Sequence, residues 1–308
     1  MKKPSAIKRI IAVLLLLPLT LCVLFGVFAL ISVSKNGRII SSNYTVISSK
    51  LTGGLRIALI SDLHARVYGD DNEPLVDLVR SSSPDIICLG GDMFEGHLLN
   101  EQFEPFLSLI ERLAEIAPVY YVPGNHDYLA YGGATVRGNR EFTGYDSRSG
   151  EIAVLEAAGA KFLESEYVDV EINGQNLRIG GYYPLAFQLE DETDEEFAAR
   201  IAFLGEFAAY DGYKLLLSHR PDTFIYEDAA VDWDIDLVLC GHTHGGVIRL
   251  PLIGALWTSE GFFPKYDMGE FDLGSMKMII TSGLNGYGRI PRVFNPPEIA
   301  VIDLAPAE

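Results

Sequence analysis

The histidines of this chain gather with carboxylates, amides and glycines in short polar clusters. Five of the six histidines belong to the clusters, which are Ser61-Asp62-Leu63-His64, Gly90-Gly91-Asp92, Gly124-Asn125-His126-Asp127, Ser218-His219 and Gly241-His242-Thr243-His244-Gly245-Gly246. Imidazole nitrogens and carboxylate oxygens are common ligands of divalent metals. Six histidines scattered at random over 308 residues would rarely fall together in this way. The joint pattern therefore indicates a shared metal site.

Taken singly, the same residues have simpler explanations. Asp62 and His64 could cap a helix, and Asn125 could belong to a turn. His219 could be a core histidine whose hydrogen bonds are satisfied. Only the combination of all clusters favours a metal site over these alternatives.

The positions of the clusters are as informative as their composition, because each follows an apolar run typical of a buried strand. These runs are residues 55–60, 86–89, 119–122, 214–217 and 236–240. Helical patterns at 75–80, 103–116 and 151–158 separate the earlier runs, as expected for βαβ units. Ligands at the carboxyl ends of strands in an open α/β sheet converge on one crevice. The clusters are therefore predicted to meet.

Three further features are predicted in the second half of the chain. Residues 162–181 look like short strands joined at Asn173-Gly174, a strong hairpin dipeptide. The acidic run that begins near Glu190 is expected to start a solvated helix, because carboxylates favour that end of a helix. Further strands are predicted near Met278 and Ile299.

The set of candidate ligands contains no thiolate. It suits Mn²⁺, Fe²⁺ or Zn²⁺ and argues against a structural zinc site. A pair of metals roughly 3.5 to 4 Å apart needs a carboxylate that bridges them, and Asp92 is the best placed candidate. The three cysteines, Cys22, Cys88 and Cys240, lie in apolar runs, which favours buried thiols over a disulfide framework.

Together the five clusters resemble the signature blocks of the calcineurin-like metallophosphoesterases. The resemblance extends over about residues 50 to 305. Its context, including Ser218-His219-Arg220-Pro221-Asp222 and Asn295-Pro296-Pro297-Glu298, is similar to a bacterial, membrane-associated branch of that family. The resemblance implies an α/β fold, a four-layer αββα sandwich in which two mixed sheets pack face to face between helices. This domain would occupy residues 55–305.

The resemblance also implies a role for each cluster residue. One metal would be held by Asp62, His64 and His244, the other by Asn125, His219 and His242, with Asp92 as the bridge. A metal-bridging hydroxide would attack phosphorus, and His126, oriented by Asp127, would protonate the leaving oxygen. The expected reaction is hydrolysis of a phosphodiester or phosphomonoester, with a lipid-linked or nucleotide-linked substrate conceivable.

Several residues depart from or add to the family pattern. Glu95 stands where an aspartate is common, and Val247 stands where glutamine is frequent, so changed substrate contacts are expected there. Arg289 and Arg292 are candidates to orient a substrate phosphate, since guanidinium groups suit phosphate geometry. His97, the sixth histidine, is predicted to be a surface loop residue.

The amino-terminal segment differs in composition from the rest. Four basic residues lie within the first nine, and residues 10–33 carry no charge, which is long enough for a membrane-spanning helix. The length of this run and the lack of an Ala-X-Ala site favour an uncleaved anchor over a cleaved signal peptide. Only Lys35 and Arg38 follow the run closely, so the positive-inside rule predicts a single-pass cell-membrane protein with a cytoplasmic amino terminus and an extracytoplasmic catalytic domain. Residues 34–54 are predicted to be a linker.

The charge of the chain bears on its partners. The formal net charge is −18, and without the four basic residues of the tail 20 Lys and Arg face 42 Asp and Glu, a charge of −22. Such a domain repels nucleic acid, so no nucleic-acid partner is expected. The alternatives to a phosphoesterase are a metal-dependent nuclease and an inactive scaffold of the same fold. A scaffold would usually have lost ligands, and none is missing here.

Overall fold

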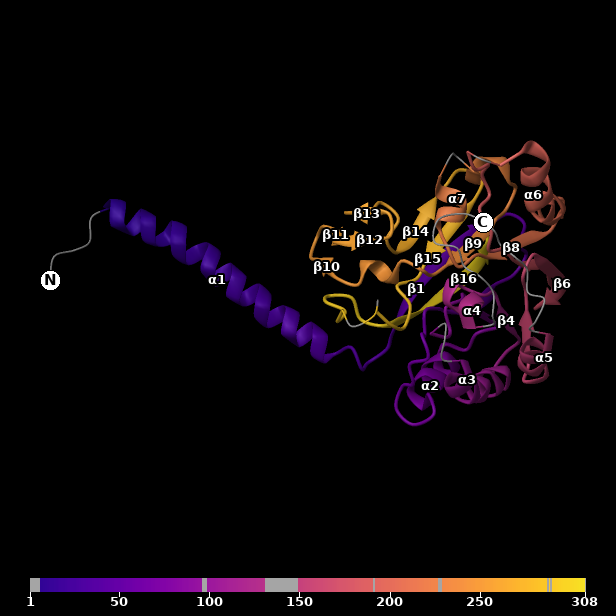
Figure 1. Cartoon of the computed structure of the whole chain (residues 1–308), viewed down its shortest axis with the longest axis horizontal. Coiled ribbons are helices and arrows are strands. Elements are labelled where there is room, and N and C mark those ends of the chain that lie inside the picture. Colours follow the sequence, from indigo (N-terminus) through magenta and orange to yellow (C-terminus); the bar gives the residue numbers. More distant parts are fainter. Residues whose placement is uncertain are drawn as a thin grey trace.

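A computed structural model of the chain describes residues 6–95, 99–130, 149–190, 192–226, 229–286, 288 and 290–307. Helix α1 (Ala6–Ser34) projects away from the remaining domain (Figure 1). Its segment Leu14–Ser34 has a mean hydropathy of 2.8 and is 0% buried, so length and composition suffice to cross a membrane. A signal sequence meets the same two criteria.

The first sheet contains six strands. Their order is β1 (Ile40–Ser48), β16 (Glu298–Pro306), β2 (Leu55–Ile60), β3 (Ile86–Leu89), β4 (Val119–Tyr121) and β5 (Ala160–Phe162). Strands β2 to β5 are parallel, and β16 runs antiparallel to β2. Side chains of α2 (Glu73–Ser82) and α3 (Leu99–Ala114) share a core cluster with one face of this sheet. Two shorter helices, α4 (Asn125–Ala130) and α5 (Ser149–Ala157), lie between β4 and β5 in the chain.

The second sheet also contains six strands. Their order is β14 (Gly269–Asp272), β15 (Lys277–Ile280), β9 (Leu237–Cys240), β8 (Tyr213–Leu217), β7 (Gln175–Gly181) and β6 (Glu166–Ile172). The four inner strands are parallel, and the two edge strands are antiparallel to their neighbours. Its outer face packs against α6 (Asp194–Ala208), α7 (Asp222–Ile225) and the 3₁₀ turn η1 (Ala229–Asp232).

The inner faces of the two sheets share one core. Leu59 of the first sheet lies in the same buried cluster as Leu215 and Leu239 of the second. In β2, Leu59 faces this shared core while Ile60 faces the helices, so the strand is buried on both sides and reads as a continuous apolar run. The predicted four-layer αββα sandwich of two mixed sheets is confirmed.

Two local predictions are confirmed as well. Strands β6 and β7 form an antiparallel hairpin, and Asn173 and Gly174 at its turn have φ values of 52° and 73°. That left-handed pair is what an Asn-Gly turn supplies. Three acidic residues occupy the first turn of α6, and the side chain of Thr193 accepts a hydrogen bond from the Glu196 amide in a capping box.

Two small ribbons complete the domain beyond the 3₁₀ turn η2 (His244–Gly246). The first pairs β10 (Arg249–Leu250) with β11 (Gly254–Ala255), and the second pairs β12 (Trp257–Thr258) with β13 (Gly261–Phe262). They lie on the side of the domain from which α1 projects (Figure 1).

The segment predicted to be a linker, residues 34–54, contains a strand. Residues Ile40–Ser48 form β1, which pairs in parallel with β16 along its whole length. Val46 is buried in the core between the sheets, while its neighbour Ile47 is exposed. The strand was missed because an edge strand needs few apolar residues, and serine, asparagine and threonine occupy most of its positions. The folded domain therefore begins earlier than residue 55.

The structure of this strand predicts unequal effects for two adjacent substitutions. Val46→Ala should lower the free energy of unfolding by about 2 kcal/mol, because it removes buried methyl groups from the core between the sheets. Ile47→Ala, at a side chain that is 61% exposed against 1% for Val46, should change it by less than about 0.5 kcal/mol. Urea unfolding of the full chain in detergent measures both. Equal effects of the two substitutions would show that β1 is not part of the core.

Candidate metal centre

The five polar clusters lie where the sequence places them, next to the carboxyl ends of strands. Asp62 follows β2, Asp92 follows β3, and Asn125 opens α4 just after β4. In the second sheet, His219 follows β8 and His242 follows β9. The two sheets bring these ends together, since the Nδ1 atom of His219 lies 2.7 Å from the carbonyl oxygen of Gly90, which directly follows β3 of the first sheet. The convergence predicted from sequence is thus observed.

The backbone at these strand ends is unusual. Positive φ values occur at five candidate ligands, namely Asp62 (55°), His64 (46°), Asp92 (53°), His242 (71°) and His244 (50°). Residues with a β-carbon rarely adopt this conformation, and it persists only where surrounding contacts enforce it. Here the Asp62 amide donates to Gly91 O at 2.9 Å and the His64 amide donates to Asp92 O at 3.0 Å. The loops are held in a shape that local preference alone would not give.

The described residues contain three groups of three potential ligands, and the third of them, His64 with Glu95 and His126, shares His64 with the first. Asp62, His64 and His244 make up the first group, and Asp92, His219 and His242 make up the second. Within each group one potential ligand atom per residue lies within 4.8 Å of the other two. Each group is therefore compact enough for its atoms to bind one ion together.

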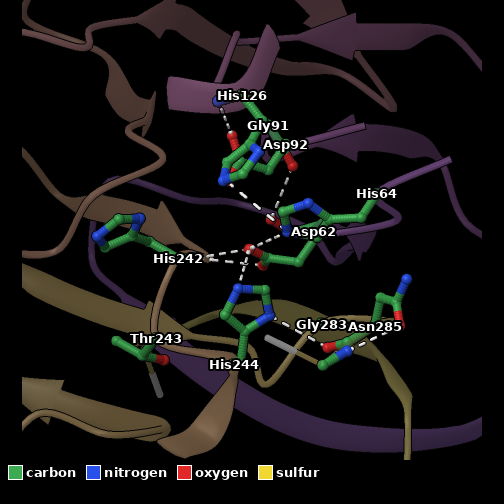
Figure 2. Close-up of polar contacts among 12 residues, drawn as sticks. Asp62, His64, Gly91, Asp92, His126, His242, Thr243, His244, Gly283 and Asn285 are labelled. Atoms are coloured by element: carbon green, nitrogen blue, oxygen red, sulfur yellow. Dashed lines mark hydrogen bonds and ion pairs between the residues drawn. The ribbon is translucent and has the colours of Figure 1, made fainter. Parts of the chain in front are cut away.

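Asp92 connects the two groups. Its Oδ2 atom lies 3.1 Å from Nε2 of His219 in its own group and 3.8 Å from Nε2 of His64 in the other. The Nε2 atom of His244 lies 3.8 Å from Oδ1 of Asp62. Figure 2 shows His64 and His244 beside Asp62 and Asp92. One carboxylate oxygen thus faces both groups, the position that a bridging ligand requires.

Backbone carbonyls fix the orientation of two imidazole rings. Nδ1 of His219 contacts Gly90 O, and Nδ1 of His244 lies 3.1 Å from Asn285 O. A carbonyl oxygen only accepts hydrogen bonds, so each Nδ1 must carry a proton, and Nε2 is the ring nitrogen that faces the carboxylates. This is the arrangement by which protein metal sites commonly set the tautomer of their histidines.

Burial keeps two of the histidines neutral. It lowers the pKa of His242 to about 4 and that of His244 to about 4. Both imidazoles are therefore unprotonated at neutral pH, the form that binds metals. Burial alone would raise the pKa of Asp92, but the nearby His219 lowers it below its usual value, so this carboxylate is ionised.

Two buried polar atoms test whether a metal fits. Oδ1 of Asn125 has no hydrogen-bond partner among the described residues. Nε2 of His64 also has no hydrogen-bond partner among the described residues. The oxygens of Asp92 and Asp62, at 3.8 and 4.0 Å, cannot donate and lie too far away. Buried polar atoms are rarely left unbonded, and both of these are electron-pair donors that suit a cation. The residues present fit divalent metals.

Comparison with known proteins agrees with this geometry. The family model described as calcineurin-like phosphoesterase matches residues 55–246, which is more than half of the chain. The chain belongs to the calcineurin-like phosphoesterase family.

Its relatives include proteins of several bacteria. The metallophosphoesterase YkuE of Bacillus subtilis is 26% identical over 82% of this chain and 79% of its own length. The phosphodiesterase YaeI of Escherichia coli is 29% identical over 81% of this chain and 82% of its own length. The UDP-2,3-diacylglucosamine pyrophosphatase LpxG of Chlamydia muridarum is 28% identical over 81% and 83%.

The carboxylate beside His126 in this chain is Glu95, although Asp127 was predicted to orient that histidine. The side chain of Asp127 is buried and accepts hydrogen bonds from the amides of Met93, Phe94 and Gly124 at 2.8, 3.0 and 2.8 Å. Asp127 therefore holds the loop after Asp92 and not the imidazole.

Glu95 contacts two histidines at once. Its carboxylate lies 3.0 Å from Nδ1 of His64 and 3.6 Å from Nδ1 of His126. The same carboxylate raises the pKa of His126 and so favours its protonated form. Glu95 was noted in the sequence as a departure from the family pattern, and changed substrate contacts were expected there. Its contact with two histidines of the site was not predicted.

Arg292, predicted to bind substrate phosphate, is buried in the protein. It is 2% exposed and donates hydrogen bonds to Asn295 O at 2.8 Å and to the carbonyl of Asn285. The Asn285 carbonyl is the acceptor that orients His244, so the structure gives Arg292 a positioning role in place of a substrate contact. Arg289 and His97 lie outside the described residues.

Close packing around Asp62 depends on a glycine of the second sheet. A β-carbon at Gly241 would overlap the Ser61 hydroxyl and come within 2.5 Å of Oδ2 of Asp62. The Asp62 carboxylate in turn accepts the His242 amide at 3.1 Å. Only glycine lets the strand end approach this candidate ligand so closely.

We expect Gly241→Ala to reduce metal content and turnover together, because Asp62 must move to make room for the methyl group. The matched control is Gly205→Ala in helix α6, where a β-carbon meets nothing within 4 Å. That change should leave metal content unaltered and should slightly favour the helix. Elemental analysis of both purified variants after loading with Mn²⁺ measures the difference. Full metal content in Gly241→Ala would contradict the role given to Asp62.

Proposed function

We propose that this protein hydrolyses phosphoesters at a centre that binds two divalent cations, Mn²⁺, Fe²⁺ or Zn²⁺. The position of Asp92 between two groups of three ligands carries this proposal. Asn125, with its buried and unbonded oxygen, would complete the second group as a ligand. Membership of the calcineurin-like phosphoesterase family supports the same reaction class.

The two cations would supply Lewis acidity to the phosphoryl group and lower the pKa of water that reaches them. The residues of the chain hold the geometry for this chemistry. Asp62, His64 and His244 would bind the first cation, and His219 and His242 would join Asn125 at the second. Because these side chains are mostly buried and fixed by backbone hydrogen bonds, little reorganisation is needed when substrate arrives.

His126 would act as the general acid. Its backbone amide donates to Oδ1 of Asp92 at 2.7 Å, which fixes the residue beside the centre. Its ring lies next to the His64 ring, with centroids 4.7 Å apart, and it is absent from the two groups that contain Asp62 and Asp92. Glu95 favours the protonated form of His126, and this proton can pass to the leaving oxygen as the ester bond breaks.

A diester or diphosphate bond in a lipid-linked or nucleotide-linked molecule is the substrate we propose. The names of two relatives, a phosphodiesterase and a pyrophosphatase for UDP-2,3-diacylglucosamine, support this class. The apolar helix α1 supports it from the chain itself, because an uncleaved membrane anchor would hold the centre close to lipid-bearing substrates. The basic residues before the helix favour an extracytoplasmic catalytic domain.

A leaving-group experiment tests this proposal. The full chain in detergent, loaded with each metal, should hydrolyse nitrophenyl phosphodiesters or phosphomonoesters. His126→Ala should retain its metals and lose roughly 10² to 10⁴ in rate on esters with alkyl leaving groups. Its loss on nitrophenyl esters should be much smaller, since nitrophenolate leaves without protonation.

The control for this experiment is Asp92→Asn, which should lose activity on both kinds of ester because it weakens both metal sites. Equal losses in His126→Ala on alkyl and nitrophenyl esters would contradict the general acid. Lack of hydrolysis by the wild-type protein with every metal and ester would contradict the proposed function as a whole.

A further inference from the structure

One short segment of the domain exposes several large apolar side chains close together in sequence. The two ribbons and their turns expose five of them within residues 252–263, namely Leu252, Ile253, Trp257, Phe262 and Phe263. Trp257 and Phe262 face each other across the β12–β13 pair, and the rings of Phe262 and Phe263 lie 6.5 Å apart. Scattered exposed apolar residues are ordinary, but a contiguous group on one feature indicates an interaction surface. We call residues 252–263 the apolar ribbon.

The apolar ribbon is joined to the end of helix α1 through Phe294. The Phe294 amide donates to the Ser32 hydroxyl at 2.6 Å, and its ring lies 5.5 Å from that of Phe25. Phe294 also lines one hollow with residues 249–254, and the adjacent Val293 accepts a hydrogen bond from the Arg249 amide at 2.9 Å. The exposed ribbon is therefore continuous with the segment where the proposed membrane span ends (Figure 1).

Charge around this junction differs from charge in the rest of the domain. Segments 10–61, 241–259 and 273–297 contain no acidic residue in a chain that has 42 of them. Lys35 and Arg38 directly follow α1, whereas Arg249 is paired with Asp267 at 2.9 Å. Glu260 does lie within the apolar ribbon, but burial raises its pKa to about 7. An acid-poor surface with exposed aromatic residues suits the headgroup region of a bilayer.

We infer that the apolar ribbon inserts into the lipid interface beside helix α1 and holds the metal centre at the membrane surface. This inference rests on the proposed anchoring by α1. The apolar ribbon follows the loop that contains His242 and His244 closely in the chain. Two side chains near the ribbon bind this loop, because Arg249 donates to Gly245 O at 3.0 Å and Asn295 donates to His244 O at 2.7 Å. Lipid contact at the ribbon would thus hold the loop of the candidate ligand His244 close to the bilayer surface.

Tryptophan fluorescence provides a direct test, because the chain has two tryptophans. Trp257 lies in the apolar ribbon, whereas Trp233 packs against the helices that cover the second sheet. The full chain is reconstituted into vesicles of phosphatidylcholine and phosphatidylglycerol in which the acyl chains are brominated near the headgroup. Trp233→Phe, which leaves Trp257 as the reporter, should be strongly quenched. Trp257→Phe, which reports Trp233, should be unaffected.

A second pair of variants tests whether side chains of the ribbon contact the lipid or only lie near it. Phe262→Ser in the Trp233→Phe background should weaken the quenching of Trp257 severalfold. Val231→Ser, at a similarly exposed apolar residue outside the ribbon, should leave it unchanged.

Flotation of the vesicles gives the remaining outcomes. Protein that floats with lipid while Trp257 is unquenched would overturn the inference but would agree with anchoring by α1. Burial of Trp257 against a second copy of the chain would give this same result. Protein that fails to float would overturn both the anchor and the lipid contact. Neither result involves turnover, so failure of the proposed phosphoesterase activity is detected separately.

Discussion

The carboxylate of Asp92 is the constraint on which the rest of the site depends. It is buried, ionised and surrounded by histidines of both ligand groups, and its other oxygen accepts the amide of His126. An isolated buried anion is costly, so the surrounding structure must supply compensating positive charge. Two cations on either side of Asp92 would meet that requirement and place His126 next to them. The same residue thus links metal binding to the position of the proposed proton donor.

The two sheets matter because neither holds a complete ligand group alone. Asp62, His64 and Asp92 follow strands of the first sheet, whereas His219, His242 and His244 follow strands of the second. Hydrogen bonds between the sheets fix their relation, among them the Leu284 amide to Ser61 O at 3.0 Å and the Asn285 amide to Asp62 O at 2.8 Å. The core between the sheets is therefore part of the reason that the site exists, since a shift of one sheet would separate the ligands of each group.

The sequence predicted the fold class and the meeting of the clusters because both follow from strong local patterns. Buried strands such as β2 are apolar throughout, and the polar residues that end them converge by topology. Strand β1 was missed because its residues are mostly polar, and burial at an edge is decided by a distant partner. The positions of Glu95, Asp127 and Arg292 depend on side-chain contacts between loops, which spacing along the chain does not encode. Asn285 was missed altogether, because its role is played by a backbone carbonyl.

The central claim is that Asp92 lies between two bound cations. Electron paramagnetic resonance of the full chain titrated with Mn²⁺ tests it most directly, because two manganese ions that share a bridging ligand couple magnetically. The structure predicts that the spectrum of isolated Mn²⁺ gives way to that of a coupled pair as the second equivalent binds. It also predicts that Asp92→Asn abolishes the coupled signal. A protein that saturates with one Mn²⁺, or that binds two without any coupling, would contradict the account.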